Sequence, residues 1–390
     1  MSQLTIEIHG TGIHNRGAEL MTLAIADRFR AKFDPIRIVV PSAYFRRPED
    51  RNRYGLYTTW EFGFQPRGWK RLVHEYGPAW LRRRARMIAP REVDLVLDAS
   101  GFAYSDQWGD RAPTWILAKM SQPERLHQPL ILLPQAFGPF IKPEAAQLCA
   151  NVFNRAELSF ARDSQSQRAV QALHTRTDLR LCPDFTVDLK PEPDHSLALP
   201  HPFFAVVPNV RMLNKTTKWE EYLRFLESAI HKVRTLGWNP VFVLHDSLSD
   251  HTVVQQLSTS SRQLPVIYHQ NPRVLKWVLG QAHAVLASRF HALIGSLAQG
   301  VPSLGAGWSH KYPELFKDFG CSELYLPDVQ DLALLDQTLT RLADSGMYQA
   351  IRDTLTASKI PISRAVESMW IEVENRIEQV RAKLNTEPGQ

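Results

Sequence analysis

The chain has 390 residues, of which 44% are hydrophobic and 22% are charged. Length and composition are typical of a globular protein of two or three domains, and they exclude wholesale disorder and a fibrous repeat. Lys and Arg total 46 against 40 Asp and Glu, an excess too small to indicate a nucleic-acid-binding protein. The sequence lacks an apolar run of roughly 20 residues, as a membrane-spanning helix needs, and its start, MSQLTIEIHG, does not read as a secretory signal.

The three cysteines, Cys149, Cys182 and Cys321, are far apart and odd in number. This pattern predicts neither a disulfide framework nor a metal-binding CxxC pair. We therefore expect a reducing compartment and a cytoplasmic protein.

The first half of the chain alternates short β-rich runs with amphipathic stretches. Several runs are nearly all-apolar, which predicts strands buried on both faces of a parallel sheet. The strands are expected at Leu4–His9, Ile36–Pro41, Asp94–Asp98, Leu130–Pro134, Glu157–Phe160 and Leu179–Cys182. The helices between them are expected at Gly17–Lys32, Pro143–Arg155 and Asp163–Leu173.

A basic segment lies between Arg67 and Arg91, where arginines and a lysine alternate with aromatic and aliphatic residues. The spacing predicts two short basic amphipathic helices. Residues 67–91 are interpreted either as a peripheral contact with anionic lipid at the inner face of a membrane, or as a solvated basic face whose aromatic side chains pack inward.

A proline-rich stretch over residues 191–202 predicts a linker, after which the alternating pattern restarts. Strands are expected at Phe203–Pro208, Pro240–His245, Val266–Tyr268, Ala284–Ala287 and Ser303–Gly305. Helices are expected at Trp219–Leu236, Ser249–Ser261, Arg273–Gly280, Arg289–Gln299 and Lys311–Phe319, and a long amphipathic helix at Ile362–Leu384.

Each half is thus a βαβ series, and the fold class is α/β with two doubly wound parallel sheets facing a cleft. The predicted domains are residues 1–190, residues 203–330, and C-terminal helices over 331–390 that pack back across them; the family resemblance given below implies that the first is the acceptor side and the second the donor side. Ligands are expected beyond the carboxyl ends of the strands.

The first strand is followed by a glycine-containing turn that carries Asn15, Arg16 and Glu19. Such a turn at a helix start presents backbone N–H groups to an anion. It departs from the dinucleotide-binding fingerprint, because Asn15 stands where the third glycine belongs. A tight turn without a ligand is the alternative.

Polar and aromatic residues follow two further strands of the first half. Ser100, Tyr104, Asp106 and Trp108 come after one strand, and Gln135 ends the next. Aromatic faces that cover C–H surfaces beside polar groups that bond hydroxyls are suited to a sugar, so these residues predict the acceptor side. The alternative is a helix cap with surface aromatics.

Cationic residues follow three strands of the second half. Arg211, Arg289 and His291 form a group suited to a small, doubly anionic substrate, because guanidinium groups bind phosphate and carboxylate. His310 and Lys311 are expected at the same rim. The segment His245–His251 contains metal-capable residues, but no further ligand completes a site and an Asp cap explains the pattern, so no metal is predicted.

The ordered set of motifs resembles the polysaccharide pyruvyl transferase family over about residues 4–320. The motifs are Asn15-Arg16-Gly17-Ala18-Glu19, Ser100-Gly101-Phe102, Leu133-Pro134-Gln135, Gly138-Pro139, Arg162-Asp163, Pro183-Asp184, Arg289-Phe290-His291, Gly300-Val301-Pro302 and His310-Lys311. Ala18-Glu19 and Ala99-Ser100 depart from residues common in the family, on the acceptor side.

The resemblance implies a GT-B-like pair of Rossmann domains and transfer of the enolpyruvyl unit of phosphoenolpyruvate onto a sugar as a cyclic pyruvate ketal, in exopolysaccharide or surface-glycan biosynthesis. It implies that Arg211 and Arg289 bind the donor, that His291 is catalytic, and that no cofactor is needed. The acceptor would be a free, nucleotide-linked or lipid-linked sugar. The alternatives are a GT-B glycosyltransferase with a nucleotide-sugar donor and an inactive carbohydrate-binding protein.

Overall fold

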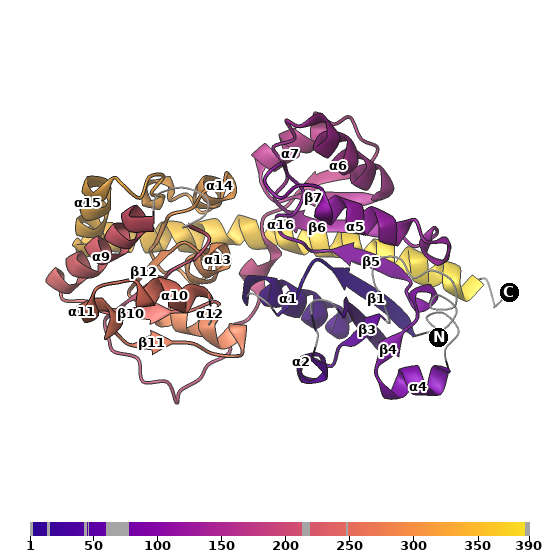
Figure 1. Ribbon diagram of the computed structural model, residues 1–390, viewed down its shortest axis with the longest axis horizontal. Coiled ribbons are helices and arrows are strands. Elements are labelled where there is room, and N and C mark those ends of the chain that lie inside the picture. The colour runs from indigo at the N-terminus through magenta and orange to yellow at the C-terminus, as the bar shows by residue number, and fades with distance from the viewer. Residues whose placement is uncertain are drawn as a thin grey trace. The chain divides into compact units, whose positions relative to one another are not determined.

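The computed structural model describes residues 3–13, 16–42, 45, 47–59, 78–212, 219–246 and 249–386. Its contacts divide the chain into two compact units (Figure 1). Unit 1 comprises Met1–His14, Met21–Phe185 and Ala365–Gln390, whereas unit 2 comprises Asn15–Leu20 and Thr186–Arg364. Residues 191–202 contain no helix or strand. The domain boundaries at 190, 202 and 330 stay a prediction.

Unit 1 is built on an eight-stranded sheet in the order β4-β3-β2-β1-β5-β6-β7-β8, and every pairing recorded in it is parallel. All residues of the central strands β1 and β5 are buried, which requires cover on both faces of the sheet. The strands are β1 (Leu4–His9), β2 (Ile36–Pro41), β3 (Tyr57–Thr59), β4 (Met87–Ile88), β5 (Leu95–Asp98), β6 (Leu130–Gln135), β7 (Leu158–Ala161) and β8 (Asp178–Leu181).

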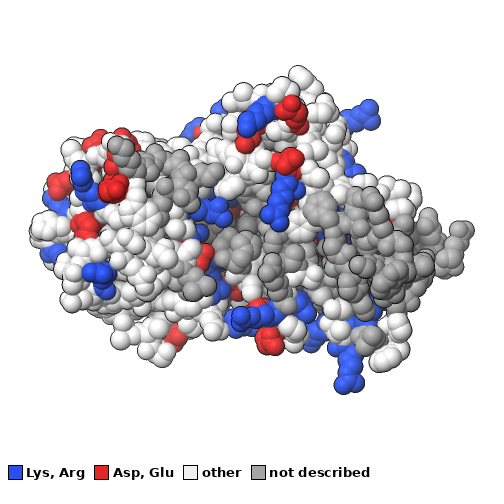
Figure 2. All heavy atoms as spheres, viewed as in Figure 1, with Lys and Arg blue, Asp and Glu red and all other residues white. Residues whose placement is uncertain are grey.

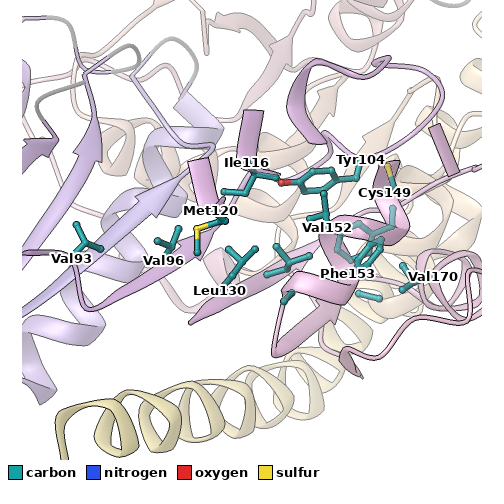
Figure 3. Packing of buried hydrophobic residues seen from close by; sticks show 14 of the residues in the cluster. Val93, Val96, Tyr104, Ile116, Met120, Leu130, Cys149, Val152, Phe153 and Val170 are labelled. Carbon is teal, nitrogen blue, oxygen red and sulfur yellow. The ribbon is translucent and has the colours of Figure 1, made fainter. Parts of the chain in front are cut away.

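The helices of unit 1 bury apolar side chains at helical spacing against these strands. Ile116 and Met120, one turn apart on α5, and Val152 and Phe153 on α6 join one buried cluster with strand residues such as Leu130 (Figure 3). The α-helices are α1 (Arg16–Lys32), α2 (Pro48–Arg53), α4 (Ala79–Arg84), α5 (Arg111–Met120), α6 (Pro143–Arg155) and α7 (Ser164–Gln171). Short 3-10 turns occupy Pro90–Glu92, Pro123–Arg125 and Phe185–Asp188.

Unit 2 is built on a five-stranded parallel sheet in the order β11-β10-β9-β12-β13. The strands are β9 (Phe203–Val207), β10 (Asn239–Val243), β11 (Val266–Ile267), β12 (Ala284–Ala287) and β13 (Ser303–Gly305). The helices are α9 (Trp219–Thr235), α10 (Ser249–Gln255), α11 (Thr259–Arg262), α12 (Pro272–Gln281), α13 (Phe290–Leu297), α14 (Lys311–Asp318), the 3-10 turn Ser322–Leu324, α15 (Leu332–Ala343) and α16 (Ser345–Thr386).

Most predicted elements agree with the structure to within one or two residues, but two helices differ. The single helix expected over 249–261 is two: α10 ends at Gln255, and Ser258 caps α11 by accepting from Ser261 N at 3.3 Å. The helix expected from Ile362 begins instead at Ser345, after Asp344 accepts from Met347 N, and it runs through Pro361. Leu355 and Val366, on either side of the proline, are both buried.

Only the second of the two short helices predicted for the basic segment can be compared with the structure. Its part before residue 78 lies outside the described residues. The remainder forms the short helix α4, then strand β4 and a 3-10 turn, and Trp80 points outward with 70% of its surface exposed.

In each sheet the strand order reverses at one place, between β1 and β5 in unit 1 and between β9 and β12 in unit 2. Ligands of doubly wound sheets bind outside the carboxyl ends of the strands at this switch point. The loops that follow these four strands are therefore where functional side chains are to be sought.

Across the described part of the chain, no helix combines the length and hydropathy that crossing a bilayer demands. Figure 2 shows acidic and basic side chains interspersed over the visible face of both units. The three cysteines are buried thiols that form no disulfide.

Candidate active site

The two loops at the switch point of unit 2 are tied to each other by hydrogen bonds. After β9, Asn209 Nδ2 donates to the carbonyl oxygen of Ser288 at 2.8 Å, and Ser288 follows β12. Ser288 N donates in turn to Val207 O at 3.1 Å. The backbone of Arg211 joins the same arrangement, since its N–H donates to Asn209 Oδ1 at 3.0 Å. Asn209 therefore fixes both strand ends as one platform.

Two buried tyrosines support this platform from behind. Tyr222 Oη donates to Ser288 Oγ at 3.1 Å and accepts from Asn209 N at 3.1 Å, and Tyr312 Oη donates to Ser288 O at 3.0 Å. Burial raises the pKa of Tyr222 to about 12, so its hydroxyl stays a donor. The position of Ser288 is thus set by side chains from helices α9 and α14.

Arg289, immediately after Ser288, is held by a buried carboxylate. Its Nε donates to Asp250 Oδ2 at 2.9 Å, and its Nη2 donates to Asp250 Oδ1. Asp250 also accepts from Val210 N at 3.2 Å and from Asp246 N at 3.1 Å. Burial raises the pKa of Asp250, although Arg289 and the Val210 N–H act in the opposite direction. Asp250 thus orients the guanidinium and joins the loops after β9, β10 and β12.

His245 lies in the loop after β10, beside this ion pair. It is 4% exposed, and its buried Nε2 has no hydrogen-bond partner among the described residues. Burial, followed by the positive charges of Arg289, His291 and Arg16, lowers the pKa of His245 to about 3. A buried polar atom left without a partner costs about 1–3 kcal/mol, so the fold holds this imidazole neutral and unsatisfied.

His291 and Arg211 complete the group of three expected from the sequence. His291 is half-buried on the first turn of α13, its ring edge-on to that of Phe290, and it acts electrostatically on His245. Arg211 is exposed. The structure therefore brings Arg289 and His291 to one place, and it brings the backbone of Arg211 to the same sheet edge. Their donor-binding and catalytic roles stay predictions.

The loop after β13 supplies a second cation. The Lys311 ammonium lies 5.1 Å from the centre of the Phe290 ring, 5.7 Å from that of Trp308 and 5.5 Å from that of Tyr312. The faces of aromatic rings attract a cation, so these three rings stabilise the ammonium. His310 is half-buried at the N-cap position of α14. Trp308 Nε1 and Ser309 Oγ are buried donors with no partner in the described part of the chain.

Arg16, expected on the acceptor side, has its contacts in unit 2. It pairs with Glu19 one turn along α1 and donates to the hydroxyl of Tyr268, which follows β11. The Glu19 carboxylate and the Tyr268 hydroxyl raise the pKa of Arg16 against the opposite effect of burial. Arg16 therefore adds positive charge near His245, while Asn15 lies outside the described residues.

The predicted acceptor residues of unit 1 surround a buried carboxylate, Asp98, at the end of β5. Asp98 accepts from Ser100 N at 3.0 Å, from Tyr104 Oη at 2.6 Å and from Gln135 Nε2 at 3.2 Å. Tyr104 and Gln135 have no exposed surface, so in this conformation they support Asp98 and the turn at Ser100. Ser100, by contrast, keeps partial exposure.

The turn at Ser100 also requires a glycine at position 10, in the adjacent loop. Gly10, after β1, has a φ of +78°, and a Cβ built on it would lie 1.9 Å from Ser100 Oγ. Further along, Asp106 accepts from Ile141 N at 2.6 Å, and the Trp108 ring lies edge-on to Phe102 at 6.0 Å. Asp106 thus fixes the loop before α6, and its acceptor-binding role and that of Trp108 stay predictions.

Two residues with clear places in this site, His245 and Asp250, were weighed from the sequence only as parts of a metal-like segment. In the described residues no group of three His, Cys, Asp or Glu side chains is placed to hold a metal ion. The signal that could have identified them is their position: a histidine directly after a buried strand, and an aspartate on the helix that follows it.

Comparisons with solved structures place this geometry in a known fold. The HepE protein of Anabaena, in complex with UDP and glucose, matches at 13% identity with a TM-score of 0.53 and coverage of 97% of this chain and 100% of that chain. The UDP-GlcNAc 2-epimerase of Neisseria meningitidis, bound to UDP-GlcNAc, matches at 12% identity with a TM-score of 0.60 and the same coverage. MnaA of S. aureus, with UDP, matches at 11% identity with a TM-score of 0.61, covering 97% of each chain. The fold is therefore GT-B, as the sequence predicted.

No curated protein matches the chain. The family model described as polysaccharide pyruvyl transferase matches residues 15–310, which include the strand ends and the cationic group described above. The chain belongs to the polysaccharide pyruvyl transferase family.

Proposed function

We propose that this protein transfers the enolpyruvyl group of phosphoenolpyruvate onto a pair of sugar hydroxyls as a pyruvate ketal, in exopolysaccharide or surface-glycan biosynthesis. Family membership supports a transferase of polysaccharide pyruvylation. The single observation that carries the donor is the group of cationic side chains at the switch point of unit 2, where Arg289 is oriented by Asp250 beside His291. A three-carbon acid that carries phosphate needs two anion contacts and a proton donor.

In the proposed reaction, His291 donates a proton to the methylene carbon of the enolpyruvyl group. Positive charge develops at the neighbouring carbon, which bears the phosphate oxygen, and a sugar hydroxyl adds there and releases its proton. A second hydroxyl then displaces phosphate at the same carbon, which closes the ketal ring and releases a second proton. One of the two released protons restores His291, and the other leaves with phosphate or solvent.

Each residue has a distinct part in this scheme. A positioned general acid contributes about 10²–10⁴ in rate, which is the share assigned to His291. Arg289 and Arg211 neutralise phosphate and carboxylate, and their charge is worth most where the leaving group gains negative charge. His310 and Lys311 would extend the positive field at the same rim.

The test is to follow phosphate release from phosphoenolpyruvate in the presence of a panel of sugar acceptors. We expect His291→Ala to lower turnover about 10²–10⁴-fold with little change in thermal unfolding, and His231→Ala, an exposed histidine of the same unit, to leave turnover unchanged. Full activity of His291→Ala would remove the mechanism.

A glycosyltransferase with a nucleotide-sugar donor is the competing function, because several solved structures of this fold were determined with UDP. Thermal stabilisation by UDP or GDP, without stabilisation by phosphoenolpyruvate, would favour it. Stabilisation by phosphoenolpyruvate alone would favour pyruvyl transfer.

We also propose a cytoplasmic location with peripheral contact at the inner face of the membrane, where a lipid-linked acceptor would be met. Support comes from α4, where the exposed residues Trp80 and Arg84 are one helical turn apart. Flotation with anionic vesicles should carry the protein at low salt, and Trp80→Ala should weaken it. Absence of flotation would contradict the contact.

A further inference from the structure

The imidazole of His245 is the most exceptional buried group outside the roles assigned above. It follows β10 in the sheet, and its chain neighbour Asp246 has Oδ2 3.8 Å from Nη2 of Arg289. Its Nε2 is buried and meets no hydrogen-bond partner within the described ranges. Ser249 Oγ, on the same segment, is a second buried polar atom in this condition. Buried polar atoms usually have hydrogen-bond partners, so these two atoms, close in sequence to the Asp250–Arg289 pair, are available to a ligand.

The groups that surround His245 indicate which ligand fits. Three cationic or protonatable groups from three elements act on it: Arg289 after β12, His291 on α13 and Arg16 at the start of α1. The nearby carboxylate of Asp250 is already occupied by Arg289 and by backbone N–H groups. Arg289 and Arg16 are each paired with a carboxylate, Asp250 and Glu19, so the hydrogen-bonding groups rather than the net charge indicate the ligand. The groups that oppose protonation of His245 also oppose a metal cation there, and a neutral N–H donor beside a guanidinium fits an anionic oxygen.

Histidines with a purely structural place in this protein look different. His283 stacks on Tyr348 with ring centres 4.4 Å apart and lies 4.6 Å from the ring of Trp238, so aromatic faces occupy it. His245 lacks such a ring partner in the described residues. Its protonation is already opposed by its neighbours, so it is a neutral imidazole with one N–H donor and one acceptor nitrogen.

We propose that His245 is a ligand-binding residue of the donor site, and that its Nε2–H donates to an oxygen of the anionic group bound beside Arg289. The chemical class of the ligand is a phosphate monoester or free phosphate. That the phosphate belongs to phosphoenolpyruvate rests on the proposed function, but anion binding at His245 does not. A bound dianion would also raise the pKa of His245, because it attracts the proton.

Binding of inorganic phosphate and of phosphoenolpyruvate to the full chain, measured by calorimetry, tests the proposal. A lost hydrogen bond to a charged group corresponds to a rise in Kd of about 10- to 100-fold, which we expect for His245→Ala. His245→Gln, whose amide nitrogen reaches a position like that of Nε2, should recover part of the affinity. His251→Ala, an exposed histidine on α10, is the matched control and should bind as the wild type does.

A second readout is independent of folding changes in the variants. In the wild-type protein, nitrogen NMR of the histidine rings should show His245 neutral at pH 5, and phosphate should shift its Nε2 resonance while leaving His251 unchanged. Unaltered phosphate affinity in His245→Ala, an Nε2 resonance indifferent to saturating phosphate, or failure of the wild type to bind phosphate would each overturn the proposal. If phosphate binds through His245 and phosphoenolpyruvate yields no ketal, only the proposed function fails.

Discussion

Two buried charged clusters, one in each unit, use similar residues for different ends. In unit 1, Glu7 on β1 pairs with Arg125 at 2.8 Å and with Lys119, and all three side chains are at most 3% exposed. In unit 2, Asp250 pairs with Arg289 beside His245 and His291. Glu7 of the first cluster is part of strand β1, whereas His245 and Arg289 of the second follow the ends of strands β10 and β12.

The two clusters differ in the state of their central buried group, a carboxylate in unit 1 and an imidazole in unit 2. Burial alone would raise the pKa of Glu7, but Arg125 and Lys119 lower it to about 2, so the charge of this carboxylate is balanced by buried cations of its own unit. The unit 2 cluster contains a buried imidazole, His245, whose Nε2 has no hydrogen-bond partner in the described chain and whose protonation is opposed by burial and by Arg289, His291 and Arg16. A buried carboxylate held between two cations contributes stability, whereas a neutral buried donor at a switch point is suited to a ligand.

The largest expected effect is on stability, in the unit 1 cluster. Glu7→Gln leaves two buried cations without their carboxylate, and we expect a loss of about 3–5 kcal/mol in the free energy of unfolding, measured by denaturant titration. Phosphate binding by the folded fraction should not change. Glu157→Gln, at an exposed acid of the same unit, is the control. A Glu7→Gln protein of normal stability would show that the cluster is not structural.

A smaller effect, on chemistry, is expected for Asp250→Asn. The amide can accept at only one of its two positions, so it cannot serve both Arg289 donors and both backbone N–H groups. Misplacement of Arg289 should lower kcat by about 10²-fold with a smaller change in KM. Asp246→Asn is the milder comparison, because Asp246 is 3.8 Å from the guanidinium. Equal losses in the two variants would argue against a positioning role for Asp250.

A pH dependence of stability, which is small per pH unit, separates the two clusters. The pKa of His245 is lowered from 6.5 to about 3, so between these values the unfolded chain binds a proton that the native chain does not. The free energy of unfolding should therefore fall as pH drops from about 6.5 towards 3, by at most about 1.4 kcal/mol per pH unit. Glu7, lowered from 4.5 to about 2, adds a loss only below pH 4.5.

Denaturation curves from pH 4 to 7 should distinguish these contributions. His245→Gln is expected to flatten the dependence above pH 4.5, whereas Glu7→Gln should leave that interval unchanged. An unchanged slope in His245→Gln would mean that this histidine is not held neutral in the native state.

The sequence alone predicted most of the fold, because its signals are local. All-apolar runs such as Leu130–Leu133 specify buried parallel strands, and Asp163 caps α7 by accepting from Ser166 N at 2.7 Å, close to the predicted start. Strands β3 and β4 were not predicted, since two or three residues carry too little pattern. The split between α10 and α11 was not predicted, because the sequence does not show whether Ser258 lies within a helix or caps one.

For the site, residue type and order along the chain were enough to single out Arg289 and His291 and to place them at a strand end. What they could not decide is which charges neutralise each other. Asp250 and Arg289 pair although they are 39 positions apart, and Gln135 bonds Asp98 across 37 positions. The burial of Tyr104 and of Nε2 of His245 depends on how neighbouring elements exclude solvent. Periodicity records which face of an element is buried, but only the packed structure determines which polar atoms meet there.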